Sequence, residues 1–157
     1  MIDMVIDSTI FDSLLAQAGE SPRLRMSRDL RNSAEDGSQR MLNAILPGSP
    51  LPVHRHRASS ETVVCLKGRL DEVFYEVVEE CEAMETSRCV DYARKRVVRE
   101  VDRVHLDADG DVRMVVIPKG AWHTVEVLEP CVIFESKDGR YEPLGEGDMI
   151  GLDSILD

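Results

Sequence analysis

The sequence predicts an all-β fold, a barrel or sandwich of short strands that one short helix precedes. From residue 38 onward, short apolar or alternating runs recur, which is the pattern of β-strands. Glycine- or proline-containing turns separate many runs, among them Pro47-Gly48, Lys67-Gly68, Lys119-Gly120 and Asp138-Gly139. The 157 residues suit one domain. We therefore expect a single domain over 1–157, with a helical lead-in at 1–37, the barrel at 38–141 and a tail at 142–157.

The helix is predicted over residues 8–18, where apolar residues follow helical spacing. Thr9 and Asp12 form a capping-box pattern, and Gly19 fits a C-terminal stop. We expect this helix to lie outside a sheet or across a partner subunit.

Seven strands are predicted, at Met41–Leu46, Glu61–Leu66, Asp71–Val78, Val97–Leu106, Val112–Pro118, His123–Leu128 and Val132–Lys137. The charged stretch 79–96 fits either the tip of a long hairpin or a helical turn. The acidic residues between positions 71 and 85 are interpreted as one solvated face.

The net charge of -11 disfavours nucleic acid and anionic membranes as partners. No Lys or Arg precedes Arg23 and the early apolar runs are short, so we expect no signal peptide or membrane span and place the chain in the cytoplasm. The four cysteines form no CxxC pair and are expected to be thiols.

Four residues are candidate ligands of one divalent metal. His54 and His56 stand two apart, so both imidazoles point to one face of an extended segment. Glu61 opens an apolar strand, where an unpaired carboxylate is costly to bury. His123 follows a Pro-Gly turn that can present a third imidazole. A lone histidine is usually no ligand, but this combination in one short chain favours a shared site.

The ligand set suits Fe, Zn, Mn, Ni or Cu, and its residues do not choose among these metals. Three imidazoles and a carboxylate leave one or two positions open on a five- or six-coordinate ion. His105 alternates with apolar neighbours and is expected to face solvent, outside the metal set.

Residues 48–68 read G-x5-H-x-H-x4-E-x6-G, which resembles the first cupin motif, and 118–123 resembles the core of the second. Val112 and Val127 stand where the second motif usually has Gly and Asn. The resemblance implies a cupin, a double-stranded β-helix or jelly-roll barrel. Five segments also resemble the WbuC family of cupin-fold metalloproteins, which is associated with surface-polysaccharide gene clusters: 21–25, 38–44, 54–56, 122–124 and 134–139.

Further residues are candidates for chemistry. Glu135 is a candidate general base or an edge partner of Lys137, and Tyr141 completes this polar cluster. Arg40, Arg55 and Lys137 are candidate substrate ligands, with solvated loop arginines as the alternative. Trp122 either walls the pocket or packs outside it, and strand alternation favours the second.

The leading functional hypothesis is a metal-dependent enzyme that acts on a small polar molecule. The WbuC resemblance implies a sugar or nucleotide sugar in surface-polysaccharide metabolism, with an isomerase or epimerase reaction. The alternatives are a non-haem metal dioxygenase and a non-catalytic, metal-dependent module that binds a sugar or carboxylate. We also expect a homodimer, because small barrels expose sheet edges that partner subunits often cover.

Overall fold

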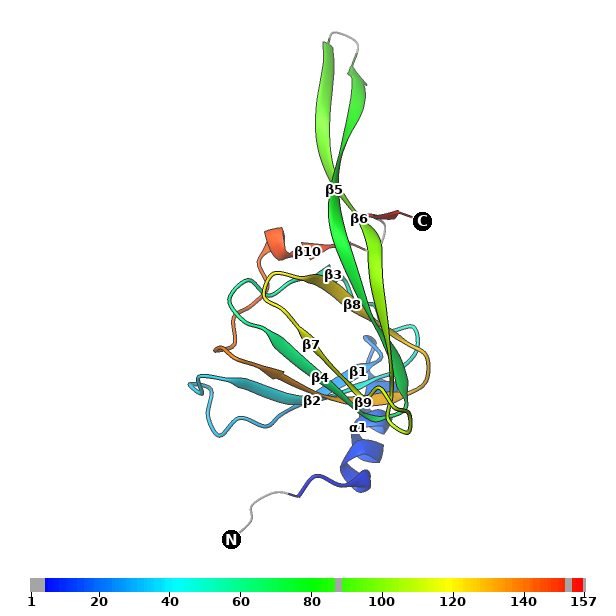
Figure 1. Cartoon of the computed structure of the whole chain (residues 1–157), viewed down its shortest axis with the longest axis vertical. Helices are drawn as coiled ribbons and strands as arrows, with labels where there is room; N and C mark the ends of the chain where they lie inside the picture. Colours follow the sequence, from blue (N-terminus) through cyan, green and yellow to red (C-terminus); the bar gives the residue numbers. More distant parts are fainter. Residues whose placement is uncertain (1–4, 87–88, 152–153, 157) are drawn as a thin grey trace.

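The structure, a computed structural model, consists of two β-sheets that face each other and one helix outside them (Figure 1). It describes residues 5–86, 89–151 and 154–156, with the backbone alone for the strand residues within 79–96. The first sheet contains, in spatial order, β1 (Arg25–Asp29), β2 (Gln39–Ile45), β9 (Cys131–Lys137), β4 (Glu61–Lys67) and β7 (Met114–Ile117). The second contains β10 (Met149–Ile150), β3 (Val53–His54), β8 (Trp122–Val127), β5 (Arg69–Thr86), β6 (Cys89–Asp107) and β11 (Ile155–Leu156).

The described strands confirm the all-β prediction. Neighbouring strands run antiparallel, apart from β11, which pairs in parallel with β6. Each of the seven predicted strands corresponds to a strand of the structure. The sheets also extend beyond the predicted limits of 38–141, because β1 precedes that range and β10 and β11 follow it.

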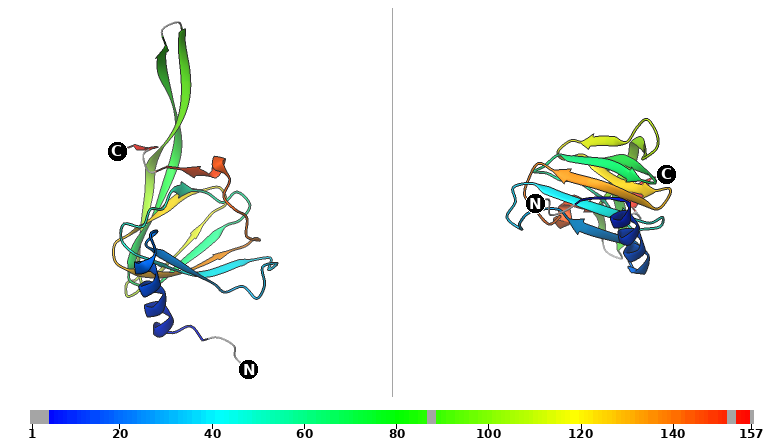
Figure 2. Two further views of the ribbon diagram at one scale, coloured as in Figure 1. Left: turned by 180° about the vertical axis from the view of Figure 1, so that it is seen from behind. Right: turned by 90° about the horizontal axis from the view of Figure 1, so that it is seen from below.

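Alternation along the strands sorts side chains between the barrel interior and the outer faces. The interior cluster joins Val63 and Ile133 of the first sheet to Leu70 and Leu106 of the second. Outside the first sheet, Leu14 and Ala18 of α1 (Ser8–Glu20) pack on the outward residues of β2 and β9, and Figure 2 shows this placement from two further sides.

The predicted helix cap is wrong in detail. Asp7, rather than Thr9, is the N-cap, because its carboxylate accepts hydrogen bonds from the amides of Thr9 and Ile10. Asp12 instead forms an ion pair with Lys67 of β4 at 2.6 Å. The helix continues through Gly19 to Glu20.

The stretch 79–96 belongs to a hairpin, so the helical alternative is wrong. β5 and β6 pair from Arg69↔Asp107 to Thr86↔Cys89, with a register shift between Phe74 and Tyr75. Only the first part of β5, Leu70–Tyr75, also pairs with β8. Beyond it, the hairpin projects from the barrel as an arm (Figure 1).

The interpretation of the acidic residues as one solvated face is wrong for Asp71 and Glu72, which are buried. The side chains of Glu79, Glu80, Glu82 and Glu85 lie outside the described residues. Cys65 and Cys131 are buried free thiols, as predicted, whereas the side chains of Cys81 and Cys89 are not described. In the described part of the chain, no helix has the length and apolar character needed to cross a membrane.

Candidate metal centre

The four predicted ligands converge at one end of the barrel interior. His54 ends β3 and lies directly opposite His123 of β8 in the strand register. His56 lies two residues after the end of β3, and Glu61 opens β4 on the facing sheet. One ligating atom from each residue lies within 4.8 Å of the other three. The turn before β8 and the loop before β4 thus bring together residues from both sheets, as the sequence predicted.

Backbone contacts orient two of the imidazoles toward the common point. The Nδ1 atoms of His54 and His123 lie 3.2 and 3.0 Å from the carbonyl oxygens of Pro52 and Ala121. An Nδ1–H that donates to a carbonyl leaves the Nε2 lone pair for a metal. The protein therefore fixes the tautomer that ligation requires at these two residues.

The buried ligating atoms lack hydrogen-bond partners among the described residues, although Nζ of Lys137 lies 3.5 Å from Oε2 of Glu61. The Nε2 atoms of His56 and His123 and Oε2 of Glu61 are buried, and none makes a hydrogen bond of proper geometry. Yet Oε2 of Glu61 lies 3.1 Å from Nε2 of His56 and 3.6 Å from Nε2 of His123. Buried polar atoms that crowd together unpaired are what a cation would satisfy, so these four residues can hold a divalent metal.

The protonation of the cluster also suits a cation. Burial first, and then the neighbouring His123, lowers the pKa of His54 from 6.5 to about 3, so this imidazole is neutral at neutral pH. Burial opposes the ionisation of Glu61, but the imidazoles of His123 and His56 outweigh that effect and hold its pKa well below the usual value. A neutral imidazole and an ionised carboxylate are the forms that bind metal.

The centre opens into a cavity of about 520 Å³ that also holds other titratable groups. Lys137 lies 3.5 Å from Oε2 of Glu61 and forms a close ion pair with Glu135, two residues earlier on β9. The amide of Asn43 donates to the other oxygen of Glu135 at 2.8 Å. The hydroxyl of Ser27 in turn donates to the Asn43 carbonyl at 2.6 Å. A polar chain therefore runs across the inner face of the first sheet to the metal centre.

Opposing effects set the protonation of this pair. Burial, and then the charge of Glu61, raises the pKa of Glu135, although Lys137 works against the shift. Burial would lower the pKa of Lys137, but Glu135 and Glu61 outweigh it and keep the pKa above its ordinary value. Glu135 is thus a stronger base than an exposed carboxylate, beside an ammonium that stays charged.

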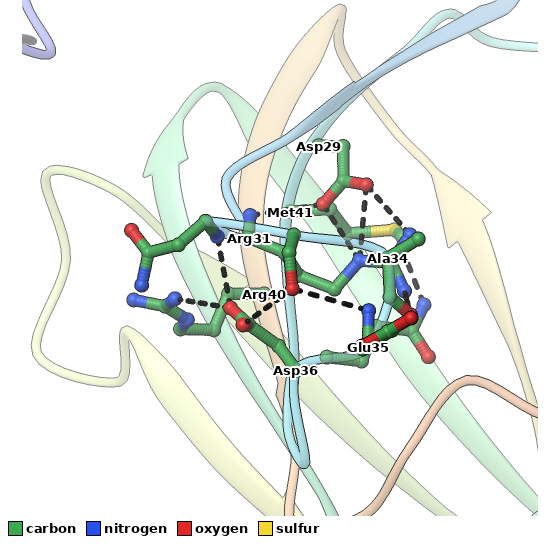
Figure 3. Close-up of polar contacts among 10 residues, drawn as sticks. Asp29, Arg31, Ala34, Glu35, Asp36, Arg40 and Met41 are labelled. Atoms are coloured by element: carbon green, nitrogen blue, oxygen red, sulfur yellow. Dashed lines mark hydrogen bonds and ion pairs between the residues drawn. The ribbon is translucent and has the colours of Figure 1, made fainter.

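The remaining predicted residues differ in their relation to this cavity. Tyr141 lines the cavity and is about half exposed. Arg40 and Arg55 are not among the residues that line this cavity. Arg40 forms an ion pair with Asp36 in the loop between β1 and β2 (Figure 3). Of these residues the structure brings only Tyr141 to the cavity, together with Glu135 and Lys137.

Arg55 is engaged on the outer side of the second sheet. Its guanidinium pairs with Asp148 at 2.8 Å and lies 4.5 Å from the centre of the Trp122 ring. Trp122 packs with Val53 and Ile150 and does not line the cavity, as alternation predicted. His105 contacts Asp71 and is three-quarters exposed, which confirms that it faces solvent.

The sequence reading missed Glu72, which also lines the cavity. Glu72 shares its strand face with Leu70 and Phe74, and that alternation was the available signal. Glu72 was overlooked because it was interpreted together with Asp71 and the acidic residues up to position 85 as one solvated face. Burial, and then the charges of Glu61 and Glu135, raises its pKa well above the ordinary value.

The family described as "Domain of unknown function (DUF6016)" matches residues 6–86. No curated protein matches the chain. A cupin-2 domain containing protein from Shewanella frigidimarina is 19% identical over 84% of this chain and 92% of its own, with a TM-score of 0.50.

Two further solved structures are similar over a smaller part of their own length. The capsular polysaccharide assembling protein CapF from Staphylococcus aureus is 18% identical over 84% of this chain, with a TM-score of 0.53. The Schizosaccharomyces pombe Cnp3 cupin domain is 11% identical over 73% of this chain, with a TM-score of 0.48. The chain spans 32% of CapF and 64% of the Cnp3 domain. The likeness to the Shewanella frigidimarina protein shows that the fold is a cupin fold. The resemblance to WbuC stays a prediction.

Proposed function

This chain belongs to the family described as Domain of unknown function (DUF6016), and we propose that it is a metal-dependent enzyme that acts on a small polar molecule. One observation carries the proposal: a titratable pair that is not needed for ligation lies beside the candidate metal centre. Lys137 lies 3.5 Å from Glu61 and contacts Glu135, and all three line one cavity. A metal with a purely structural role would not need a titratable pair beside it.

His54, His56, Glu61 and His123 would hold the metal, which supplies Lewis-acid polarisation of a substrate oxygen when bound. Glu135 is the residue that accepts a proton from the substrate. Its two oxygens each accept one hydrogen bond, from Lys137 and Asn43, so lone pairs remain for a substrate proton. Lys137 holds the carboxylate in place and offsets the charge of Glu61 next to it.

We infer an isomerase or epimerase type of reaction, because both begin with removal of a proton from a carbon beside a polarised oxygen, a step that a metal site and one base can perform. A sugar or nucleotide sugar is the substrate class that the resemblance to the WbuC family supports. CapF, which is named a capsular polysaccharide assembling protein, shares the fold with this chain but carries no argument for the reaction.

The test begins with metal analysis of anaerobically purified protein. The metal-loaded protein is then incubated in D2O with sugars, sugar phosphates and nucleotide sugars, and NMR follows deuterium exchange at carbon. We expect exchange with at least one compound, and its loss in Glu135→Gln. The control Glu129→Gln removes a carboxylate that pairs with Arg69 at the surface and should leave exchange unchanged.

Other outcomes would decide against the isomerase. Substrate-dependent oxygen consumption without deuterium exchange would indicate a dioxygenase. Tight metal and sugar binding without either reaction would indicate a non-catalytic binding module.

We also propose that the chain forms a homodimer. The strand β7 lies at the edge of the first sheet, and its Met114 and Val116 are more than half exposed. An exposed apolar edge strand favours association with another chain. Light scattering should give twice the monomer mass at micromolar concentration, and a monomer mass would contradict the proposal.

A further inference from the structure

The carboxyl group of Glu72 lies in the inner wall of the cavity, without a hydrogen-bond partner among the described residues. Glu72 is on the inward face of β5, opposite Val125 of β8 and Val104 of β6 in the strand register. Its side chain is fully buried, and neither carboxyl oxygen makes a hydrogen bond within the protein. An apolar wall thus surrounds a polar group that faces the cavity.

The neighbouring residue on β5, Asp71, is a buried carboxyl group that does have partners. Asp71 points to the outer face of the same strand and is also buried. Its two oxygens contact His105 at 2.6 Å and Arg103 at 2.9 Å. A buried carboxyl that lacks such partners destabilises a fold, and residues of this kind are typical of functional sites.

The charges in the cavity wall indicate which ligand would satisfy Glu72. Of the two cations that line the cavity, Lys137 already contacts Glu135 and Glu61. Arg25 donates to the carbonyl of Pro50 at 2.6 Å. Arg25 thus has only neutral partners among the described residues, but at Glu72 itself the negative charges of Glu61 and Glu135 outweigh the positive charge of Lys137. Leaving the metal itself aside, this charge balance disfavours a phosphate or carboxylate beside Glu72.

We propose that Glu72 binds a hydroxyl group of an uncharged sugar or polyol at the inner end of the cavity. A protonated carboxyl can donate one hydrogen bond and accept another, which matches the two roles of a sugar hydroxyl. This inference deepens the proposed function and rests on it for the small polar ligand. It adds the charge class of the ligand and the residue that recognises it.

The test measures equilibrium binding to the zinc-loaded protein. Saturation-transfer NMR and titration are used with neutral pentoses, hexoses and their alditols, and with the 6-phosphates of the hexoses. We expect at least one neutral compound to bind, more tightly than its phosphate ester. Glu72→Leu should weaken this binding by about 10- to 100-fold, the usual effect of losing a hydrogen bond to a ligand polar group. Glu72→Gln keeps a donor and an acceptor and should weaken it less than about 3-fold.

Thermal unfolding of the same variants separates a binding role from a structural one. Glu72→Leu removes an unpaired buried group and should raise the Tm while it loses the ligand. The matched control Asp71→Leu breaks two contacts outside the barrel, so it should lower the Tm and leave the dissociation constant unchanged.

The inference is overturned if no neutral compound binds, if phosphate esters bind more tightly, or if Glu72→Leu binds as well as the wild type. Its failure is distinct from that of the proposed function. Neutral-sugar binding without any turnover contradicts only the enzyme. Turnover of phosphorylated sugars that is insensitive to Glu72→Leu contradicts only the role of Glu72.

Discussion

His54 and His123 face each other across adjacent strands, as register partners of β3 and β8 with ring centres 4.4 Å apart. The two residues lie 69 positions apart in the sequence, so the antiparallel pairing of the two strands creates the site. Because β3 contains only Val53 and His54, this pairing is short. The geometry of the candidate metal centre therefore depends on the short pairing of β3 with β8 at this end of the barrel.

The first prediction concerns metal content. His123→Ala should lower zinc affinity by more than the roughly 10- to 100-fold that loss of an outer-shell partner costs, since it removes a ligand. His105→Ala removes an imidazole that contacts Asp71 outside the barrel and should leave affinity unchanged. Competitive chelator titration of the two variants provides the comparison. An equal loss in both would show that the four residues do not form the site.

The second prediction concerns the pH response of the metal-free protein. Since the folded pKa of His54 is about 3 and the unfolded value is 6.5, the unfolded chain takes up a proton first as the pH falls. His54 should therefore reduce the free energy of unfolding below pH 6.5, by up to about 1.4 kcal/mol per pH unit. The imidazole signals of His54 in NMR should not shift between pH 8 and 5. In the urea-unfolded chain the same signals should titrate normally, and normal titration in the folded protein would contradict the prediction.

The candidate ligands could be predicted because each of the two segments that supply them carries a local signal. His54, His56 and Glu61 stand close together in sequence, and the Pro-Gly turn before His123 places the fourth ligand at the start of a strand. Within one short segment, the spacing of residues largely determines which side chains point in the same direction. The proximity of Glu135 and Lys137 in the sequence likewise suggested that they pair, but it did not show that the pair lies inside the cavity.

Long-range pairing limited the rest of the prediction. Asp148 holds Arg55 and Arg57 from a position more than 90 residues away, and no local pattern marks that contact. Glu72 was misjudged because it was grouped with Asp71 and the acidic residues that follow up to position 85, whereas its neighbours across the sheet are Val104 and Val125. The composition of a segment describes the neighbours of a residue along the chain. Whether its side chain is buried depends on its neighbours in the folded structure.

The third prediction tests the two glycines that frame the first motif. Both have left-handed backbone, with φ of 83° at Gly48 and 75° at Gly68. A Cβ at position 68 would lie 2.2 Å from the carbonyl oxygen of Pro130, whereas one at 48 would lie 3.7 Å from the Leu24 side chain. Gly48→Ala should cost about 1–2 kcal/mol of stability from the backbone alone. Gly68→Ala should cost clearly more, and equal urea midpoints for the two variants would refute the argument from the clash.

The last prediction concerns the buried pair on β9. In Lys137→Met, the buried Glu135 carboxylate loses its cation while Glu61 remains close to it. Removing one partner of a buried ion pair typically costs about 3–5 kcal/mol. Replacing both partners, in Lys137→Met with Glu135→Leu, should cost less than the single change, because no uncompensated charge remains. Urea unfolding gives these free energies.

Lys119→Met serves as the control, since Lys119 lies at the surface 3.9 Å from Asp138 and should change stability by less than about 0.5 kcal/mol. If the double variant is the least stable of the set, the pair contributes packing rather than charge compensation, and Glu135 has lost the support for its role as a base.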